Sequence, residues 1–287
     1  MAQKTLSNLK NTNRTFDNVL DSYLNLQDGG QINADFTHMS KFDLGAQVVL
    51  GQQSDGSAFS GVAGETNQWT FRCGNTLSVV AIGDNQTLVG PALATTGLDV
   101  SGDGTNNDGW EFRGKSSLAL GKLNKDYFTV GTSPAFYIKC EFSVADISDV
   151  DKVVLGFAKD EAFNATVADY DALATIGILD GAGDVKTDTI YNGASNVTTD
   201  LTSVTDWTDG DIKGFIVKVS ETGDVTYMIS EGDGGTYSTS PQAVAYSFDS
   251  GEVVTPYWYH IHAAGSAAGI IWRKFEFGLQ EGANLPG

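Results

Sequence analysis

The sequence is poor in the residue types that staple small secreted domains and in those that span membranes. Its 287 residues include only two cysteines, Cys73 and Cys140, whose spacing fits no metal-ligand pattern. Cys140 falls on the apolar side of an alternating segment, so we expect a buried free thiol in preference to a disulfide. No apolar run reaches the ~18 residues of a transmembrane helix, and the N-terminus lacks the apolar stretch of a signal peptide. We therefore expect no membrane span and no export by a signal-peptide route.

Basic residues are also scarce, with 17 Lys and Arg against 36 Asp and Glu and a formal net charge of −19. Three of them, Lys4, Lys10 and Arg14, lie within the first 14 positions, which hold no acidic residue. The rest of the chain therefore carries 14 basic and 36 acidic side chains. A body of that sign repels phosphate backbones, so we predict no nucleic-acid binding. Such a surface suits a saline medium or divalent cations, or is simply an acidic soluble surface.

The clearest positive signal is a pair of alternating segments between residues 212 and 230. Apolar and polar residues alternate on both sides of Ser220–Asp224, a short turn that contains glycine. This pattern predicts an antiparallel hairpin. A second hairpin turn is predicted at Asp180–Asp184. Many short strands without intervening helices predict an all-β fold built as a two-sheet antiparallel sandwich. Further strands are expected at residues 47–50, 68–73, 77–82, 136–144, 153–158, 174–179, 185–191, 253–262 and 270–277.

The chain divides into three regions. Residues 1–30 form a predicted N-terminal arm, whose apolar residues recur at helical spacing and so predict one amphipathic helix. That helix would dock either on its own β-domain or on another subunit, because a short isolated helix is marginal in water. Residues 31–95 are β-rich and are either outer strands or a small separate domain, and residues 96–287 form the main sandwich. The arm residues expected to contact a partner are Lys4, Lys10, Arg14, Phe16, Val19, Leu20, Tyr23 and Leu24.

Two resemblances follow from these segments. The strand at 136–144, the VVLGFA segment at 153–158, the hairpin IVKVSETGDVTYMIS and the closing pair PYWYHIHAAGSAAGIIWRKFEF together resemble the concanavalin A-like lectin/glucanase jelly roll. The whole chain, with its basic arm, Gly/Asn-rich turns and acidic body, also resembles virion structural proteins of tailed phages, especially capsid decoration proteins. The first resemblance implies a jelly-roll sandwich that hosts lectins, glycosidases and structural shells alike.

No catalytic constellation is found. The jelly-roll glucanases that the fold resembles carry their carboxylates on one strand as E-x-D-x-(x)-E, and this pattern is absent. Glu141 and Glu276 stand alone in their segments, whereas glycoside hydrolysis needs two carboxylates about 5–10 Å apart. The sequence also lacks a GxSxG elbow and a GxxxxGK[ST] loop. We therefore expect no catalytic residue and no enzymatic activity.

Metal binding has weak candidates only. Asp99, Ser101, Asp103 and Asn107 partly match a calcium loop, but Trp110 stands where a bidentate Glu is required. This segment either holds Ca²⁺ weakly or is an ordinary polar turn, and the same alternatives apply to Asp180, Asp184 and Asp188. His260 and His262 share one face of a strand, near Trp258. They would hold Zn²⁺ only with a third ligand, so a packed or hydrogen-bonded aromatic face is the simpler interpretation. No other cofactor is expected.

Glycan binding would use aromatic platforms, and Trp207, Trp258 and Tyr257 are the candidates. Trp207 is expected on a loop, within the polar segment Thr205–Gly210. Such aromatic residues are also ordinary core material.

The sequence as a whole predicts a non-enzymatic virion structural protein, a capsid decoration protein at the virion surface that attaches through its arm to capsid or other virion proteins. We expect a homo-oligomer, with a trimer as the guess. The alternative is a lectin-like module that recognises host-surface polysaccharide.

Overall fold

A computed structural model describes residues 32–35, 48–49, 66–71, 76–82, 92–94, 97–101, 106–113, 127–161, 164, 166–179, 182–201, 205–232, 235–242, 244–263 and 269–280. The predicted arm and its helix lie outside these residues. Within them, every strand pairing is antiparallel and the strands form two sheets. The all-β, two-sheet antiparallel sandwich predicted from the sequence is confirmed.

The first sheet has eight strands in the order β16-β15-β14-β9-β18-β6-β5, with β1 also paired to β18. Its central strands β9, β14 and β18 direct alternate apolar residues into the core. Their other face is mixed, and there Tyr137 and Ile216 form a small buried cluster with Met228 and Tyr237. The strands of this sheet are β1 (Ile32–Asp35), β5 (Ala92–Ala94), β6 (Gly97–Asp99), β9 (Phe136–Val144), β14 (Ile212–Val219), β15 (Val225–Glu231), β16 (Ser238–Thr239) and β18 (Ile270–Leu279).

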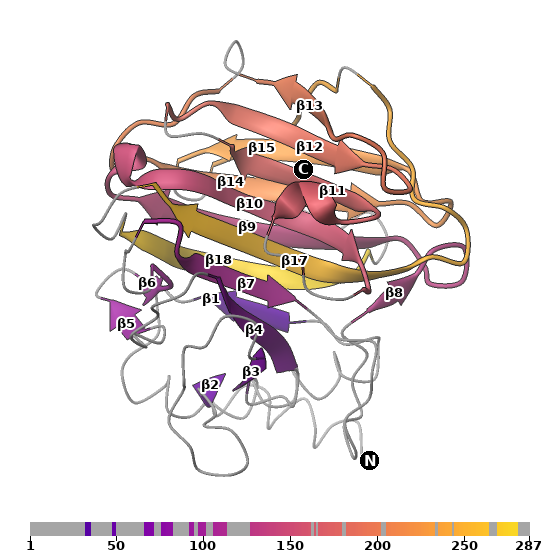
Figure 1. Cartoon of the computed structure of the whole chain (residues 1–287), viewed down its shortest axis with the longest axis horizontal. Coiled ribbons are helices and arrows are strands. Elements are labelled where there is room, and N and C mark those ends of the chain that lie inside the picture. Colours follow the sequence, from indigo (N-terminus) through magenta and orange to yellow (C-terminus); the bar gives the residue numbers. More distant parts are fainter. Residues whose placement is uncertain are drawn as a thin grey trace, which may run out of the picture.

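The second sheet has ten strands in the order β13-β12-β11-β10-β17-β7-β4-β3-β2, with β8 also paired to β17. Its central strands lie in front of β9, β14 and β18 in Figure 1. Its strands are β2 (Val48–Val49), β3 (Thr66–Phe71), β4 (Thr76–Ile82), β7 (Gly109–Arg113), β8 (Phe128–Thr129), β10 (Val150–Lys159), β11 (Leu173–Ile178), β12 (Val185–Ile190), β13 (Val197–Asp200) and β17 (Val253–His262). Two short 3-10 helices, η1 (Ile147–Asp149) and η2 (Val167–Asp169), lie in the connections.

The hairpin predicted at 212–230 is confirmed as β14 and β15, which pair from Lys213↔Glu231 to Val219↔Val225. Gly223 has φ +98° in the turn, a conformation that favours glycine, and its amide donates to the Ser220 carbonyl at 3.0 Å. The second predicted hairpin is present as β11 and β12.

The region 31–95, for which the sequence left two alternatives, contributes β1 to β5. These strands pair into both sheets: β1 and β5 join the first, and β2, β3 and β4 extend the second beyond β7. In Figure 1 these strands lie at one side of the sandwich. In the described part of the chain, no helix is long and apolar enough to cross a membrane.

Between the two sheets lies the main hydrophobic core, which is rich in aromatic rings. Phe128 stacks on Phe136 with ring centroids 4.4 Å apart, and the ring of Phe157 meets both edge-on. Cys140 is fully buried in this core and forms no disulfide, as predicted. The other cysteine of the chain, Cys73, lies outside the described residues.

Candidate functional site

The aromatic residues expected to form a glycan platform are in the core instead, which corrects that expectation. Trp207 is 1% exposed, and Trp258 and Tyr257 are fully buried. The ring of Trp207 stacks on Phe142 with centroids 4.7 Å apart, because its loop folds back between the sheets. A ring without exposed surface cannot stack on a sugar, so none of the three offers a platform in this structure.

The histidine pair on β17 is a hydrogen-bonded aromatic face, the simpler of its two interpretations. Trp258 donates from Nε1 to Nδ1 of His260 at 3.0 Å, and Nε2 of both His260 and His262 lies against the Ser101 carbonyl. Because Nδ1 of His260 accepts the hydrogen bond from Trp258, the proton of the neutral ring is on Nε2. Burial, and secondarily His262, lowers the pKa of His260 well below its ordinary value, so the ring is neutral.

The partial calcium loop is folded as a polar turn at the residues that the structure describes. Asp99 accepts through Oδ1 from both the amide and the hydroxyl of Ser101, at 2.9 and 2.6 Å. The hydroxyl of Ser101 also accepts from the Ile270 amide at 2.7 Å. Asn107 is exposed, and Asp103 lies outside the described residues. Among the residues that the structure describes, no group of three His, Cys, Asp or Glu side chains is placed to hold a metal ion.

Glu141 and Glu276 lie on neighbouring strands of the first sheet, each beside a cation. In the pairing of β9 with β18, Glu141 stands opposite Lys274 and Glu276 stands opposite Lys139. Lys274 donates to Glu141 at 3.5 Å, and the Tyr137 hydroxyl donates to Glu276. The two carboxylates thus alternate with lysines on the outer face of the sheet.

The structure brings together a different set of residues in an open groove of about 310 Å³. The groove lies between the β12–β13 edge of the second sheet and residues 244–247. In the described part of the chain, three large apolar side chains are exposed: Tyr191 at 49%, Val197 at 44% and Val244 at 59%. All three line this groove, together with Thr189, Ala194, Ser195, Ala245, Tyr246 and Ser247. Convergence of exposed apolar surface on one hollow makes this groove the candidate binding site.

The groove is fixed by hydrogen bonds behind its lining. The Tyr246 hydroxyl donates to the Ile190 carbonyl at 2.7 Å, which ties the 244–247 segment to the end of β12. The Thr189 hydroxyl donates to the Val197 carbonyl at 3.2 Å across the β12–β13 pair. Asn192, at φ +48°, and Gly193, at φ +67°, reverse the chain directly after Tyr191. The two walls are therefore held in place relative to each other.

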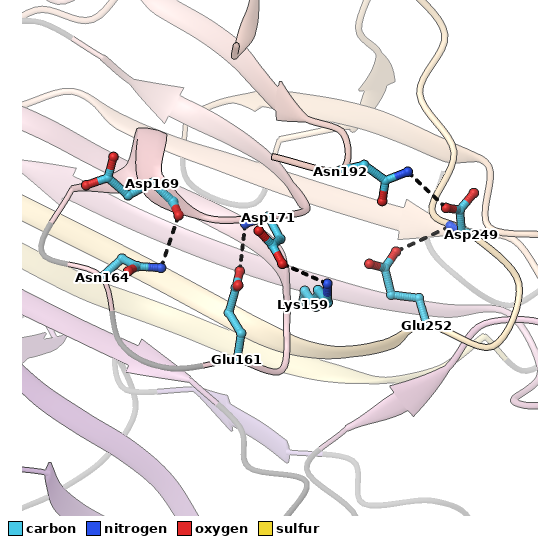
Figure 2. A network of polar contacts seen from close by, with 8 residues as sticks. All are labelled: Lys159, Glu161, Asn164, Asp169, Asp171, Asn192, Asp249 and Glu252. Atoms are coloured by element: carbon cyan, nitrogen blue, oxygen red, sulfur yellow. Dashed lines mark hydrogen bonds and ion pairs between the residues drawn. The ribbon is translucent and has the colours of Figure 1, made fainter. Parts of the chain in front are cut away.

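The Tyr191 ring is oriented by an acidic rim. Its hydroxyl donates to Oδ1 of Asp249 at 3.0 Å, and Asn192 donates to Oδ2 of the same carboxylate at 3.3 Å. The hydrogen bond to Asp249 raises the pKa of Tyr191, so the phenol is neutral. The Asp249 amide in turn donates to Glu252 at 3.3 Å. Figure 2 shows Asn192, Asp249 and Glu252 as one connected set.

A second polar set lies beside the rim. Lys159 donates to Oδ2 of Asp171 at 2.9 Å, and Glu161 accepts from the Asp171 amide at 2.8 Å (Figure 2). The hydrogen bond with Asp171 raises the pKa of Lys159. The positive charge of Lys159 in turn opposes the rise in the pKa of Glu252. Partial burial raises the pKa of Glu161 and of Glu252. The groove therefore opens onto a region where carboxylates outnumber cations.

The chain has distant structural neighbours but no match in sequence. No known protein family and no curated protein sequence matches the chain. Among solved structures, it is similar to the protein of unknown function SO2946 from Shewanella oneidensis MR-1, at 12% identity over 86% of this chain and 84% of that one, with a TM-score of 0.45. It is also similar to the VIP36 exoplasmic/lumenal domain in its Ca²⁺/Man3GlcNAc-bound form, at 10% identity over 73% and 86% of the chains and a TM-score of 0.47.

A third similar structure is the CBM2 module of the evolved Dit of Lactobacillus casei BL23 phage J-1. It is 12% identical over 69% of this chain and 88% of that one, with a TM-score of 0.39. These similarities concern the arrangement of strands alone. The ligands named for those proteins are their own.

Proposed function

We propose that this protein is a glycan-binding module that holds its ligand in the groove at Tyr191. The observation that carries the proposal is the convergence of Tyr191, Val197 and Val244 on one hollow. A sugar ring presents a flat array of C–H bonds that packs on an aromatic face, and hydroxyls that need hydrogen-bond partners at its edge. Tyr191 supplies such a face, and the hydroxyls of Ser195 and Ser247 line the same groove.

The rim favours a neutral ligand. Asp249 and Glu252 lie beside the groove, and the whole chain has a formal net charge of −19. Glycans with uronic or sialic acids would bring a carboxylate toward these groups, which like-charge repulsion disfavours. We therefore expect neutral polysaccharide, such as hexose polymers of a host surface, to bind better than acidic polysaccharide.

A glycan array with the purified protein tests the proposal. We expect specific signals on neutral glycans, unchanged when Ca²⁺ is removed, and loss of those signals in Tyr191→Ala. Tyr127→Ala is the matched control, because Tyr127 is a partly exposed tyrosine that does not line the groove. Equal binding by wild type and Tyr191→Ala would refute the groove as the site, and an array without signals would refute the function.

We propose further that the module is not an enzyme. In support, each of the two carboxylates singled out in the sequence has a lysine as its cross-strand neighbour, and Glu141 is only 2% exposed. A carboxylic acid that transfers protons to a sugar must reach the scissile bond. Incubation with the glycans that bind should release no reducing sugar, and release that Glu141→Gln abolishes would contradict the proposal.

A virion role is a second candidate, supported by the charge asymmetry of the chain. The first 14 residues carry three cations and no acid, whereas the remainder is strongly acidic. We propose that the arm attaches the sandwich to capsid or other virion proteins, with the groove facing outward on an oligomer, for which a trimer is our expectation. Deletion of residues 1–28 should abolish attachment to particles and leave the sandwich folded. Normal assembly of the truncated protein would overturn this role without touching the groove.

A further inference from the structure

A buried carboxylate outside the groove is connected to it by an unbroken series of contacts. Glu111 lies in the middle of β7 and is fully buried. Nε of Arg113, two residues along the same strand, lies 3.1 Å from Oε1 of Glu111. The Tyr170 hydroxyl donates to the other oxygen, Oε2. Glu111 stands opposite Tyr259 on β17, and Arg113 stands opposite Tyr257.

Tyr170 belongs to a segment that covers this face of the second sheet. We call residues 166–172 the strap. It contains η2, and it buries Val167, Tyr170 and Ala172 to within 2% of full burial. The Tyr170 ring meets the Tyr257 ring edge-on, with centroids 5.5 Å apart. Val167, Tyr170 and Tyr257 belong to a small hydrophobic cluster separate from the main core, whereas Ala172, at the end of the strap, packs in the main core.

The strap also supports the groove. The carbonyl of Asp171 accepts from the Gly193 amide at 2.7 Å. Gly193 and Asn192 form the turn after Tyr191, whose ring is the aromatic face of the groove. Lys159 donates to Oδ2 of Asp171, and Glu161 accepts from the Asp171 amide, as Figure 2 shows. A strap that leaves the sheet would therefore release the turn that positions Tyr191.

We propose that the strap is a pH-dependent latch, closed while Glu111 is protonated and loosened when Glu111 ionises, and that it thereby regulates ligand binding in the groove. The inference rests on the proposed function of the groove for its last step only. The coupling of Glu111 to the Gly193 turn stands on the contacts just described.

The direction follows from the surroundings of Glu111. Burial raises its pKa to about 7, against the opposing effects of Arg113 and of the Tyr170 hydrogen bond, and Glu161 adds to the rise. The groups that face Glu111 are Arg113 on its own strand, Tyr257 and Tyr259 on β17, and Tyr170 and Glu161 on the covering side. With the strap away, water reaches the carboxylate and its pKa falls toward 4.5.

Ionisation therefore favours the open strap. The closed state is fully favoured below pH 4.5 and loses that advantage as the pH rises through 7, since a shift of 2.5 pKa units changes the opening equilibrium by about 300-fold at most. Ligand affinity should accordingly be higher at pH 5 than at pH 8. The phenols facing Glu111 do not titrate in this range, because burial raises the pKa of Tyr170, Tyr257 and Tyr259.

Solvent exchange of the Gly193 amide, followed by NMR on the whole protein, tests the latch without any ligand. The protection of this amide, corrected for the intrinsic rate, should fall by up to about 70-fold between pH 5 and pH 8 in the wild type. It should be nearly constant in Glu111→Gln, which keeps the size and the hydrogen-bonding oxygen of the side chain. The Gly232 amide, which donates to the Ile212 carbonyl at the open end of the β14–β15 hairpin, is the internal control and should behave alike in both proteins.

Tyr170→Phe provides a second variant, should Glu111→Gln fold poorly. It keeps the ring against Tyr257 and removes the hydroxyl that contacts Glu111. We expect severalfold lower protection of Gly193 at pH 5. The same pH course of Gly193 protection in wild type and Glu111→Gln would overturn the latch, even if Tyr191→Ala abolishes glycan binding. If the protection of Gly193 follows the predicted pH course but the protein binds no glycan, the latch stands and the proposed function is refuted.

Discussion

Replacing Glu111 by Gln should remove a specific part of the pH dependence of global stability. In the folded protein, burial raises the Glu111 pKa to about 7 from 4.5 in the unfolded chain. Between these values the folded state binds the proton more tightly, so protonation stabilises the fold, and this stabilisation is lost as the pH rises through 7. At 1.36 kcal/mol per unit, the full difference is about 3 kcal/mol.

About 0.8 kcal/mol of this stabilisation is already lost at pH 5. The remaining stabilisation, about 2.5 kcal/mol, is lost between pH 5 and pH 8.5. The difference in unfolding free energy between Glu111→Gln and wild type should shift by that amount in favour of the variant. The loss of charge beside Arg113 adds a constant offset, which cancels when the two pH values are compared. Other buried carboxylates are common to both proteins and cancel in the same way.

Urea unfolding followed by tryptophan fluorescence measures this shift, with both proteins studied at several pH values and with matching denaturant slopes. The result that would refute the reasoning is a free-energy difference between variant and wild type that is the same at pH 5 and pH 8.5. Such a result would mean that the Glu111 carboxylate is ionised in the folded protein throughout this range. The latch at the strap would then lose its driving force.

Three further predictions concern the core and its turns. Trp207→Ala should lower the unfolding free energy by about 3–5 kcal/mol in urea titrations, because it empties a fully packed site in the core; a surface-like change below ~1 kcal/mol would place the ring outside the core. Gly183→Ala should lower the unfolding free energy more than Gly251→Ala in the same assay. Both glycines have positive φ, but only at Gly183 would a Cβ meet backbone, 2.2 Å from the Trp207 carbonyl oxygen. Equal losses would mean that the clash costs nothing beyond the ~1–2 kcal/mol of the positive φ. In a Cys73→Ser background, the Cys140 thiol should react with Ellman's reagent only after unfolding, because burial raises its pKa well above the ordinary value; fast reaction of the native protein would contradict its burial.

The central strands were predictable because their signal is local. In β9 and in the β14–β15 hairpin, inward and outward residues alternate along the sequence just as they do in the sheet. The pairing of β1 to β5 with both sheets was not predictable, since the sequence of residues 31–95 does not say which partners those strands find. That information resides in contacts with β7 and β18, far along the chain.

The groove could not be predicted from the sequence either, because its residues also meet only in the folded chain. Trp207 sits among polar neighbours and reads as exposed, yet Phe142 from β9 and the backbone of Gly183 enclose it. Tyr191 and Val197 lie close together around the β12–β13 turn, but Val244 is far along the chain, and only the fold brings it beside them. Glu111 points away from the core in the alternating pattern of its strand, so its side chain would be expected to be exposed to solvent. The strap covers it instead.

The central claim is that Tyr191 forms the sugar-binding face of the groove, and calorimetric titration with a glycan selected on the array tests it most directly. Tyr191→Phe keeps the ring and should retain affinity within about tenfold, while Tyr191→Ala should lose about 2 kcal/mol or more, roughly 30-fold in Kd. Tyr127→Ala should bind as the wild type does. Wild-type affinity in Tyr191→Ala would contradict the account.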